Sequence, residues 1–323
     1  MPSANPLLSV RNLVVRYGLS GSRRQSITAV RDVSLDIARG RIQALVGESG
    51  SGKTSLARAI LRLLPIESGQ VLFRGADLAT LDRRQLRDAR RHLQAVFQDP
   101  LASLSPRRNV LQALLEPLDH FRIGAAAQRP ERALAALETV GLSPALRLRY
   151  PHELSGGQRQ RVSLARALVT EPDLIIADEP VSSLDVPVQA RIIDLIRELR
   201  DRLGLSFLFV SHDLSVVRRV ADDVAVMYSG TLLETGPAAR LFDQPAHPYT
   251  RCLLAAIPAP DPGLPPPAVI GGEPPSALTP PRGCVFHMRC PDRFEPCSTK
   301  QPGETSASMP EFDHRVRCHL WNS

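Results

Sequence analysis

The chain has 323 residues with 43% apolar residues, which is enough for a buried core and excludes wholesale disorder. Its net charge of +7 comes from basic residues spread along the chain, so the charge alone does not indicate an anionic partner. No apolar run reaches the roughly 18 residues that span a bilayer, and the first sixteen residues lack a signal-peptide core. We therefore expect a cytosolic chain whose membrane work would need partner chains.

Short apolar runs predict strands, in chain order, over residues 13–15, 33–37, 42–46, 174–177, 205–210 and 224–227. Helix-like stretches lie at 53–64, 161–169 and 188–203. Strands that alternate with helices predict an α/β core with a largely parallel sheet, and the start of the chain indicates an antiparallel β-subdomain beside it. The Ala-, Leu- and Arg-rich stretch 107–167 is expected to be a mostly helical insertion.

Ten prolines between residues 258 and 281 exclude a persistent helix or sheet there. The sequence thus predicts three parts: a core over 1–257, a Pro-rich linker over 258–282, and an extension over 283–323 that holds four of the five cysteines.

A glycine-rich motif follows the apolar run 42–46 and opens a helix. It reads Gly47, Glu48, Ser49, Gly50, Ser51, Gly52, Lys53 and Thr54. This is the G-x-x-x-x-G-K-[ST] pattern, in which backbone N–H groups and the helix N-terminus cradle phosphates. Lys53 can reach the β- and γ-phosphates, and the Thr54 hydroxyl can ligate Mg²⁺.

A second part of the predicted site ends the apolar run 174–177. Asp178 and Glu179 follow that run, and acidic residues at the carboxyl end of a parallel strand face the ligand crevice. Asp178 is placed to hold Mg²⁺, directly or through water, and Glu179 is placed to orient or polarise an attacking water.

A pentapeptide then narrows the class of ATPase. It consists of Leu154, Ser155, Gly156, Gly157 and Gln158. With the phosphate loop and the acidic strand, it resembles the signature motif of ABC ATPases. The resemblance implies a RecA-like core, an ATP-hydrolysing enzyme, and a sandwich of two subunits in which the signature serves the nucleotide bound by the other subunit.

Four further positions match that family. Gln98 resembles the Q-loop glutamine that contacts Mg²⁺ or water, and Asp185 lies in a segment that resembles the D-loop. His212 resembles the switch histidine that contacts the γ-phosphate, while Tyr17 resembles the aromatic residue that stacks on adenine. Since no catalytic position is degenerate, the chain is expected to hydrolyse ATP rather than act as a passive structural partner.

Segments around these motifs resemble the ATPases of oligopeptide and dipeptide importers. They are residues 97–106, 150–153, 178–190 and 247–250, with Pro187 as a departure at a helix start, where proline is tolerated. The resemblance implies two transmembrane permease subunits, a second and different ATPase subunit, an extracytoplasmic solute-binding protein, and a position on the cytoplasmic face of the membrane.

The segment 283–291 also resembles the C-terminal extension of those importers, in which some members carry a [4Fe–4S] cluster. The four cysteines are Cys284, Cys290, Cys297 and Cys318. Their spacing is not the paired C-x-x-C of common zinc sites, and four thiolates suit such a cluster. Zinc, with His287, His314 or His319 as a further ligand, and plain reduced thiols stay open. Cys252 is expected to be a core thiol.

Two other functions are weighed against peptide import. A nickel or metal-chelate importer has ATPases that closely resemble the peptide group. A soluble ABC protein acting on nucleic acid or ribosomes would gain from the positive charge, but such proteins usually carry two cassettes or long coiled coils, and neither is seen in this sequence. We therefore expect no nucleic-acid partner.

Overall fold

The computed structural model describes residues 6–18, 26–99, 103–257, 270–276, 278–307 and 314–321. The chain divides into two compact units. Unit 1 comprises residues 1–38, 42–79 and 211–323, and unit 2 comprises residues 39–41 and 80–210. Each unit is described by itself.

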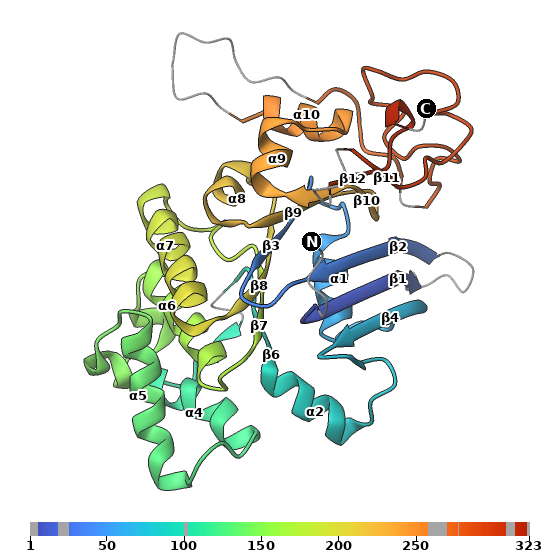
Figure 1. The fold of residues 1–323 in the computed structure, drawn as a ribbon. Helices are drawn as coiled ribbons and strands as arrows, with labels where there is room; N and C mark the ends of the chain where they lie inside the picture. The colour runs from blue at the N-terminus through green and yellow to red at the C-terminus, as the bar shows by residue number, and fades with distance from the viewer. Residues whose placement is uncertain are drawn as a thin grey trace. The chain divides into compact units, whose positions relative to one another are not determined.

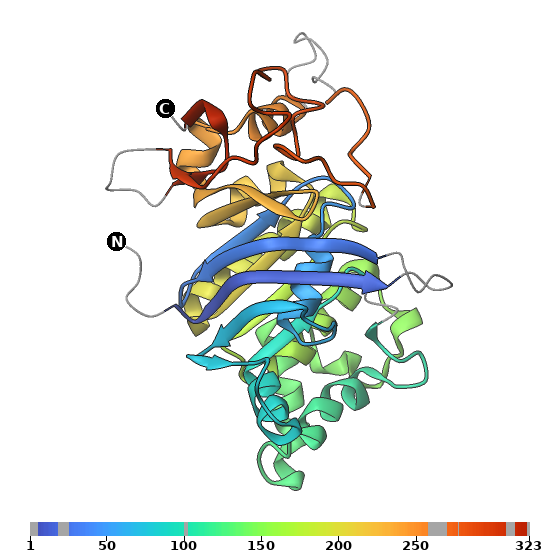
Figure 2. The same cartoon turned by 90° about the vertical axis from the view of Figure 1, so that its right-hand side faces the viewer.

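An antiparallel sheet forms the first part of unit 1 (Figures 1 and 2). Its strands, in the order β2-β1-β4-β5, are β1 (Leu8–Gly18), β2 (Ser26–Ile37), β4 (Ser68–Phe73) and β5 (Ala76–Asp77). Leu8, Val10, Leu13 and Val15 of β1 are fully buried, while the residues between them are more exposed. Burial of one face is what fixes the register of such a sheet. The predicted antiparallel β-subdomain is therefore confirmed.

A second group of strands in unit 1 contains β3 (Ile42–Val46), β9 (Asp223–Tyr228), β10 (Thr231–Pro237), β12 (Arg315–Val316) and β11 (Thr305–Ser306). β3 pairs with β9 in parallel, and β10, β12 and β11 follow in antiparallel pairs. All five residues of β3 are buried, as expected for a parallel strand covered on both faces. The C-terminal extension thus adds two short strands next to β10.

The described residues of unit 1 also form the helices α1 (Lys53–Ile60), α8 (Leu214–Val220), α9 (Ala238–Asp243) and α10 (Pro248–Ala255). The extension ends in a short 3₁₀ turn, His319–Trp321. Most of the described residues of the extension have no regular secondary structure, and Figure 2 shows them as a series of loops close to α9 and α10.

Unit 2 contains the parallel strands β6 (Leu93–Val96), β7 (Leu174–Asp178) and β8 (Ser206–Ser211), with β7 in the middle. Its helices are α2 (Arg83–His92), α4 (Val110–His120), α5 (Arg129–Thr139), α6 (Gly156–Leu168) and α7 (Val186–Leu203). Short 3₁₀ turns cover Ala126–Gln128, Pro144–Leu148 and Pro151–Glu153. The stretch 107–167 is helical as expected.

Element boundaries differ from the sequence expectation where local capping decides them. Helix α1 ends at Ile60 rather than near 64, because Arg62 adopts a left-handed conformation (φ +55°) that stops the helix. Helix α6 begins at Gly156, five residues earlier than expected, because the Ser155 side chain caps it. Proline tolerance at a helix start is confirmed in α7, where Pro187 lies in the first turn.

The three-part division with a linker over 258–282 stays a prediction, since residues 258–269 and 277 lie outside the described residues. Residues 100–102 of the segment after Gln98 lie outside them as well. Among the helices that are described, none combines the length and hydropathy needed to cross a membrane.

Candidate nucleotide-binding site

The phosphate loop connects β3 to α1 in unit 1, and two of its glycines are required by backbone geometry. Gly47 has φ +151°, and a Cβ there would lie 2.1 Å from the Met227 carbonyl oxygen. Gly52, the N-cap of α1, has φ +106°, and its Cβ would lie 2.3 Å from the Ala29 carbonyl oxygen. Both neighbours are backbone atoms that cannot yield, so the loop conformation depends on glycine at both positions.

The Lys53 side chain folds back into this loop. Its Nζ donates hydrogen bonds to the carbonyl oxygens of Gly47 and Glu48, at 2.8 and 2.9 Å, and the residue is only 5% exposed. A positive charge and the N-terminus of α1 therefore share one small loop. Both features favour a phosphate group.

Two further predicted residues of unit 1 are positioned by neighbouring elements. The half-buried Tyr17, at the end of β1, donates a hydrogen bond from its hydroxyl to Ser55 Oγ (2.9 Å), the third residue of α1. His212 directly follows β8 and is exposed, and the next residue, Asp213, caps α8. Stacking of Tyr17 on adenine and contact of His212 with a γ-phosphate stay predictions.

In unit 2, two predicted catalytic residues meet at the carboxyl end of β7. Gln98 Nε2 donates to Glu179 Oε2 at 3.1 Å, although 81 positions separate the two residues. Glu179 has a left-handed backbone (φ +48°), and its N–H donates to the Val210 carbonyl oxygen (2.9 Å) at the end of β8. The preceding Asp178 is buried. An uncommon conformation held in this way, at a predicted catalytic carboxylate, supports a functional interpretation.

The signature segment of unit 2 is a helix start with a reciprocal cap. Ser155 accepts from the Gln158 N–H, and Gln158 Oε1 accepts from the Ser155 N–H. The glycines have a packing role that the sequence did not suggest. A Cβ on Gly156 would lie 3.1 Å from Leu184 Cδ2, and one on Gly157 would lie 2.6 Å from Val188 Cγ1. The signature therefore packs against the residues around the α7 N-cap, which is Asp185.

One residue of the phosphate loop has a partner that sequence reasoning missed. Arg289, in the C-terminal extension, donates to both carboxylate oxygens of Glu48, at 2.7 and 3.0 Å. The hydrogen bond to Glu48 raises the pKa of Arg289 above its usual value, so the guanidinium stays charged. The sequence signal for such a partner was the presence of an acidic residue, Glu48, in a loop that binds anions.

The four cysteines of the extension are buried or partly buried. The pKa values of Cys284 and Cys290 are raised to about 11, chiefly by burial, and the neighbouring thiols Cys318 and Cys297 contribute to the shift of Cys284. The thiols of Cys284 and Cys290 are therefore protonated at neutral pH. Even so, in the part of the chain that is described, no group of three or more His, Cys, Asp or Glu side chains is arranged to hold a metal ion.

The histidines that were candidates for a mixed zinc site form hydrogen bonds at separate places. His314 Nε2 lies 2.8 Å from the buried carboxylate of Glu234. The ring nitrogens of His287 and His319 lie 2.8 Å from the carbonyl oxygens of Cys284 and Lys300. Cys252, expected in the core, is only partly buried on α10.

Comparisons with known proteins agree with this geometry. Residues 30–182 match the family model "ABC transporter", and residues 233–297 match "Oligopeptide/dipeptide transporter, C-terminal region". A putative peptide import ATP-binding protein of Brucella ovis is 51% identical over 92% of this chain and 93% of its own length. The oligopeptide transport ATP-binding protein AppF of Bacillus subtilis is 43% identical over 95% of this chain and 94% of its own.

Two solved cassettes align with about three quarters of this chain. The dimeric, post-hydrolysis state of the ATP-binding cassette MJ0796 bound to ADP and Pi aligns with a TM-score of 0.64 at 29% identity. It covers 72% of this chain and 98% of the cassette. CbiO1 of Clostridium perfringens, part of the ABC transporter complex cbiONQ, aligns with a TM-score of 0.65 at 28% identity, covering 74% of this chain and 92% of its own.

The fold and the phosphate loop thus define an ATP-binding cassette ATPase. With both family regions matched and relatives aligned over nearly the whole length, the chain belongs to the oligopeptide/dipeptide family of ABC transporter ATP-binding subunits.

Proposed function

We propose that this chain couples ATP binding and hydrolysis to the uptake of oligopeptides or dipeptides across the cytoplasmic membrane. The match of residues 233–297 to the oligopeptide/dipeptide transporter C-terminal region carries the proposal. The printed names of relatives such as AppF support it, since they describe peptide or oligopeptide transport. The ATPase would act at the cytoplasmic face, docked on two transmembrane permease subunits and served by an extracytoplasmic solute-binding protein.

Different residues of the site would bind the phosphates and activate the attacking water. Lys53 and the N–H groups of the phosphate loop would hold the β- and γ-phosphates. Glu179, in contact with Gln98, would orient the attacking water and accept its proton, while His212 would contact the γ-phosphate.

Thr54, Asp178 and Gln98 would hold Mg²⁺. Their hydroxyl, carboxylate and amide oxygens are the donor types that this ion prefers. When bound, the ion would neutralise charge on the transferred phosphoryl group.

The signature segment would act on the nucleotide held by a second ATPase subunit, which we expect to be a different chain. Ser155 is exposed at the start of the 13-residue helix α6, so its hydroxyl and the helix N-terminus are accessible to an anion from another molecule. A related cassette has been solved as a dimer with ADP and Pi. Asp185, near the signature at the α7 N-cap, would contribute to communication within that dimer.

Reconstitution tests the transport assignment. The chain would be purified with its permease and partner ATPase subunits in vesicles, and ATP hydrolysis measured with the binding protein loaded with peptide or with a nickel chelate. Stimulation by peptide is expected. Stimulation by the nickel chelate alone would replace peptide import with metal import.

We also propose that the four cysteines of the extension take up a [4Fe–4S] cluster. Their partial burial and mutual electrostatic influence support the proposal, although the described side chains would have to turn to form a ligand set. Protein purified without oxygen should be brown and contain about four iron atoms per chain. A colourless preparation with zinc, or with no metal, contradicts it.

A further inference from the structure

The acidic residue of the phosphate loop has all of its polar groups engaged. Its N–H donates to the Tyr249 hydroxyl (3.0 Å), and its carbonyl oxygen accepts from Lys53 Nζ (2.9 Å) and from the Ser51 N–H (3.2 Å). Its carboxylate accepts the two bonds from Arg289. The partners of the Glu48 N–H and of its carboxylate, Tyr249 and Arg289, thus both come from beyond position 248.

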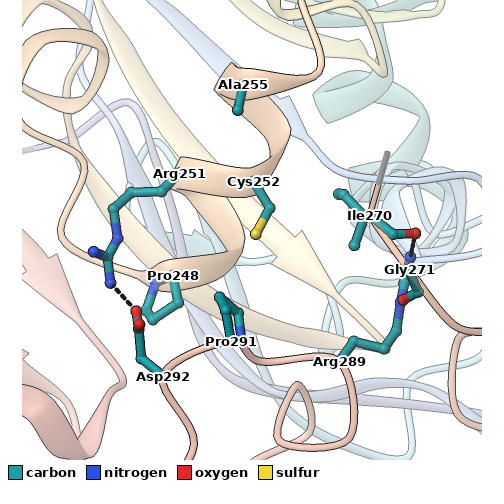
Figure 3. Close-up of a pocket in the computed structure, with 9 residues that line it drawn as sticks. All are labelled: Pro248, Arg251, Cys252, Ala255, Ile270, Gly271, Arg289, Pro291 and Asp292. Carbon is teal, nitrogen blue, oxygen red and sulfur yellow. Dashed lines mark hydrogen bonds and ion pairs between the residues drawn. The ribbon is translucent and has the colours of Figure 1, made fainter. Parts of the chain in front are cut away.

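Arg289 is itself held in one geometry. Its side chain is 5% exposed, its Nε donates to the Gly271 carbonyl oxygen (2.9 Å), and its Nη2 donates to the Ile270 carbonyl oxygen (3.2 Å; Figure 3). Its Nη1 also donates to the Tyr228 hydroxyl at 3.2 Å. A bidentate guanidinium–carboxylate pair with this much support is among the stronger polar contacts in proteins.

Aromatic packing fixes the base of this contact. Tyr228 of β9, Tyr249 of α10 and Phe286 of the extension have ring centroids 4.7 to 5.3 Å apart. All three side chains are almost completely buried. The extension is therefore joined to the phosphate loop by a packed cluster and not by one mobile side chain.

The charges explain why a partner is needed. A carboxylate in a loop that receives a triphosphate would repel it, unless a fixed positive charge compensates. We propose that Arg289 is a positioning residue for ATP binding: from the C-terminal extension it neutralises Glu48 and fixes the first turn of the phosphate loop. The extension then contributes directly to nucleotide affinity, independently of which solute is transported and of whether the cysteines hold metal.

Four full-length variants test this: Arg289→Met, Glu48→Gln, the double variant, and Arg251→Met as a matched control. Arg251, on α10, pairs with Asp292 of the extension at 2.5 Å (Figure 3). The control thus removes another arginine–carboxylate contact of the extension without touching the loop.

Binding of a fluorescent ATP analogue to the purified chain and the KM for ATP of the assembled transporter would be measured. Arg289→Met should raise Kd and KM by about 2- to 30-fold with a smaller change in kcat. The double variant should bind ATP more tightly than Arg289→Met, because the uncompensated carboxylate is gone. Arg251→Met should bind like the unmodified chain.

The change in ATP affinity when Glu48→Gln is added to Arg289→Met separates positioning from a merely structural role. If the double variant binds ATP no better than Arg289→Met, or if Arg251→Met weakens binding equally, the proposal is wrong. Should Arg289→Met not fold, Arg289→Gln serves instead. It also removes the charge while keeping a polar side chain, so the same order of affinities is expected, and an unchanged Kd would overturn the proposal. Failure of peptide stimulation would leave these binding results untouched.

Discussion

Two glycine-rich turns of this chain each open a helix, and they are packed in opposite ways. In the phosphate loop, Gly47 and Gly52 face backbone oxygens of β9 and β2 at distances that no Cβ could tolerate, and Lys53 is enclosed by loop carbonyls. In the signature, the glycines face only side-chain carbons of Leu184 and Val188, and Ser155 is exposed. The phosphate loop is therefore a finished cradle within one chain, whereas the signature is a surface that suits a ligand held by another molecule.

The largest expected effect is on ATP turnover, in a variant that should still bind ATP but not hydrolyse it. Glu179→Gln should reduce ATP turnover of the assembled transporter by about 10²- to 10⁴-fold, because the amide cannot accept a proton from water. Nucleotide binding by the isolated chain should be retained, since the phosphate loop is unchanged. Steady-state hydrolysis and analogue binding would be measured, with the exposed Glu198→Gln as control. Hydrolysis close to that of the control would refute the role of Glu179.

The next largest effect is expected on ATP affinity, from a substitution in the phosphate loop. Gly52→Ala places a Cβ against the Ala29 carbonyl oxygen at a φ of +106°. Such strain costs of the order of 1–3 kcal/mol, so ATP affinity of the isolated chain should fall about 10- to 100-fold. The matched variant is Gly50→Ala, whose Cβ would meet nothing within 4 Å although its φ is also positive. Equal losses would show that backbone strain alone, and not the close approach of β2, limits the loop.

A negative charge placed in the signature segment should lower ATP turnover of the assembled transporter without changing nucleotide binding by the isolated chain. Ser155→Asp keeps a side chain that caps α6 well but adds a negative charge where a partner's triphosphate is expected. Turnover should fall roughly 10-fold or more from repulsion, while Ser155→Asn, which caps equally well without charge, should stay near the unmodified rate. Reduced nucleotide affinity of isolated Ser155→Asp would contradict the comparison between the two turns.

The last prediction concerns the pH dependence of folding stability rather than ATP turnover or binding. Burial lowers the pKa of His247 to about 4, while the charge of Glu234 opposes the shift. The folded state thus keeps His247 neutral, with Nδ1 accepting from the Tyr249 N–H. An unfolded chain takes up a proton near pH 6.5, so stability should fall as the pH drops from about 6.5 towards 4, by on the order of 3 kcal/mol.

Thermal unfolding between pH 7.5 and 4.5 would measure this loss. The variant His247→Asn retains a capping oxygen without a titratable ring, so its unfolding temperature should depend less on pH over that range. An unchanged pH dependence would show that other groups cause the loss.

The sequence predicted the parts whose patterns are local. The run 42–46 and the glycines after it define β3 and the phosphate loop, and Ser155 with Gln158 defines the start of α6. Short strands such as β4 and β6 were missed, because runs of six and four residues that include polar side chains carry little periodicity. The contact between Gln98 and Glu179 depends on the pairing of β6 with β7, which alternation of elements suggests only in outline.

The contact between Glu48 and Arg289 could not be predicted by local patterns at all. A chain rich in arginine offers many candidate partners for one carboxylate, and only the aromatic cluster of Tyr228, Tyr249 and Phe286 selects among them. The same limit applies to the cysteines, whose spacing suggested a common site but could not give side-chain directions.

The separation of Glu48 and Arg289 by 241 positions has a consequence for biosynthesis. At roughly 5 to 20 residues per second, the ribosome adds the arginine about 10 to 50 seconds after it has added the glutamate. During that interval the nascent phosphate loop lacks both Arg289 and, for most of the time, the Tyr249 hydroxyl. Full affinity for ATP should therefore be reached only after the segment that contains Arg289 has left the ribosome.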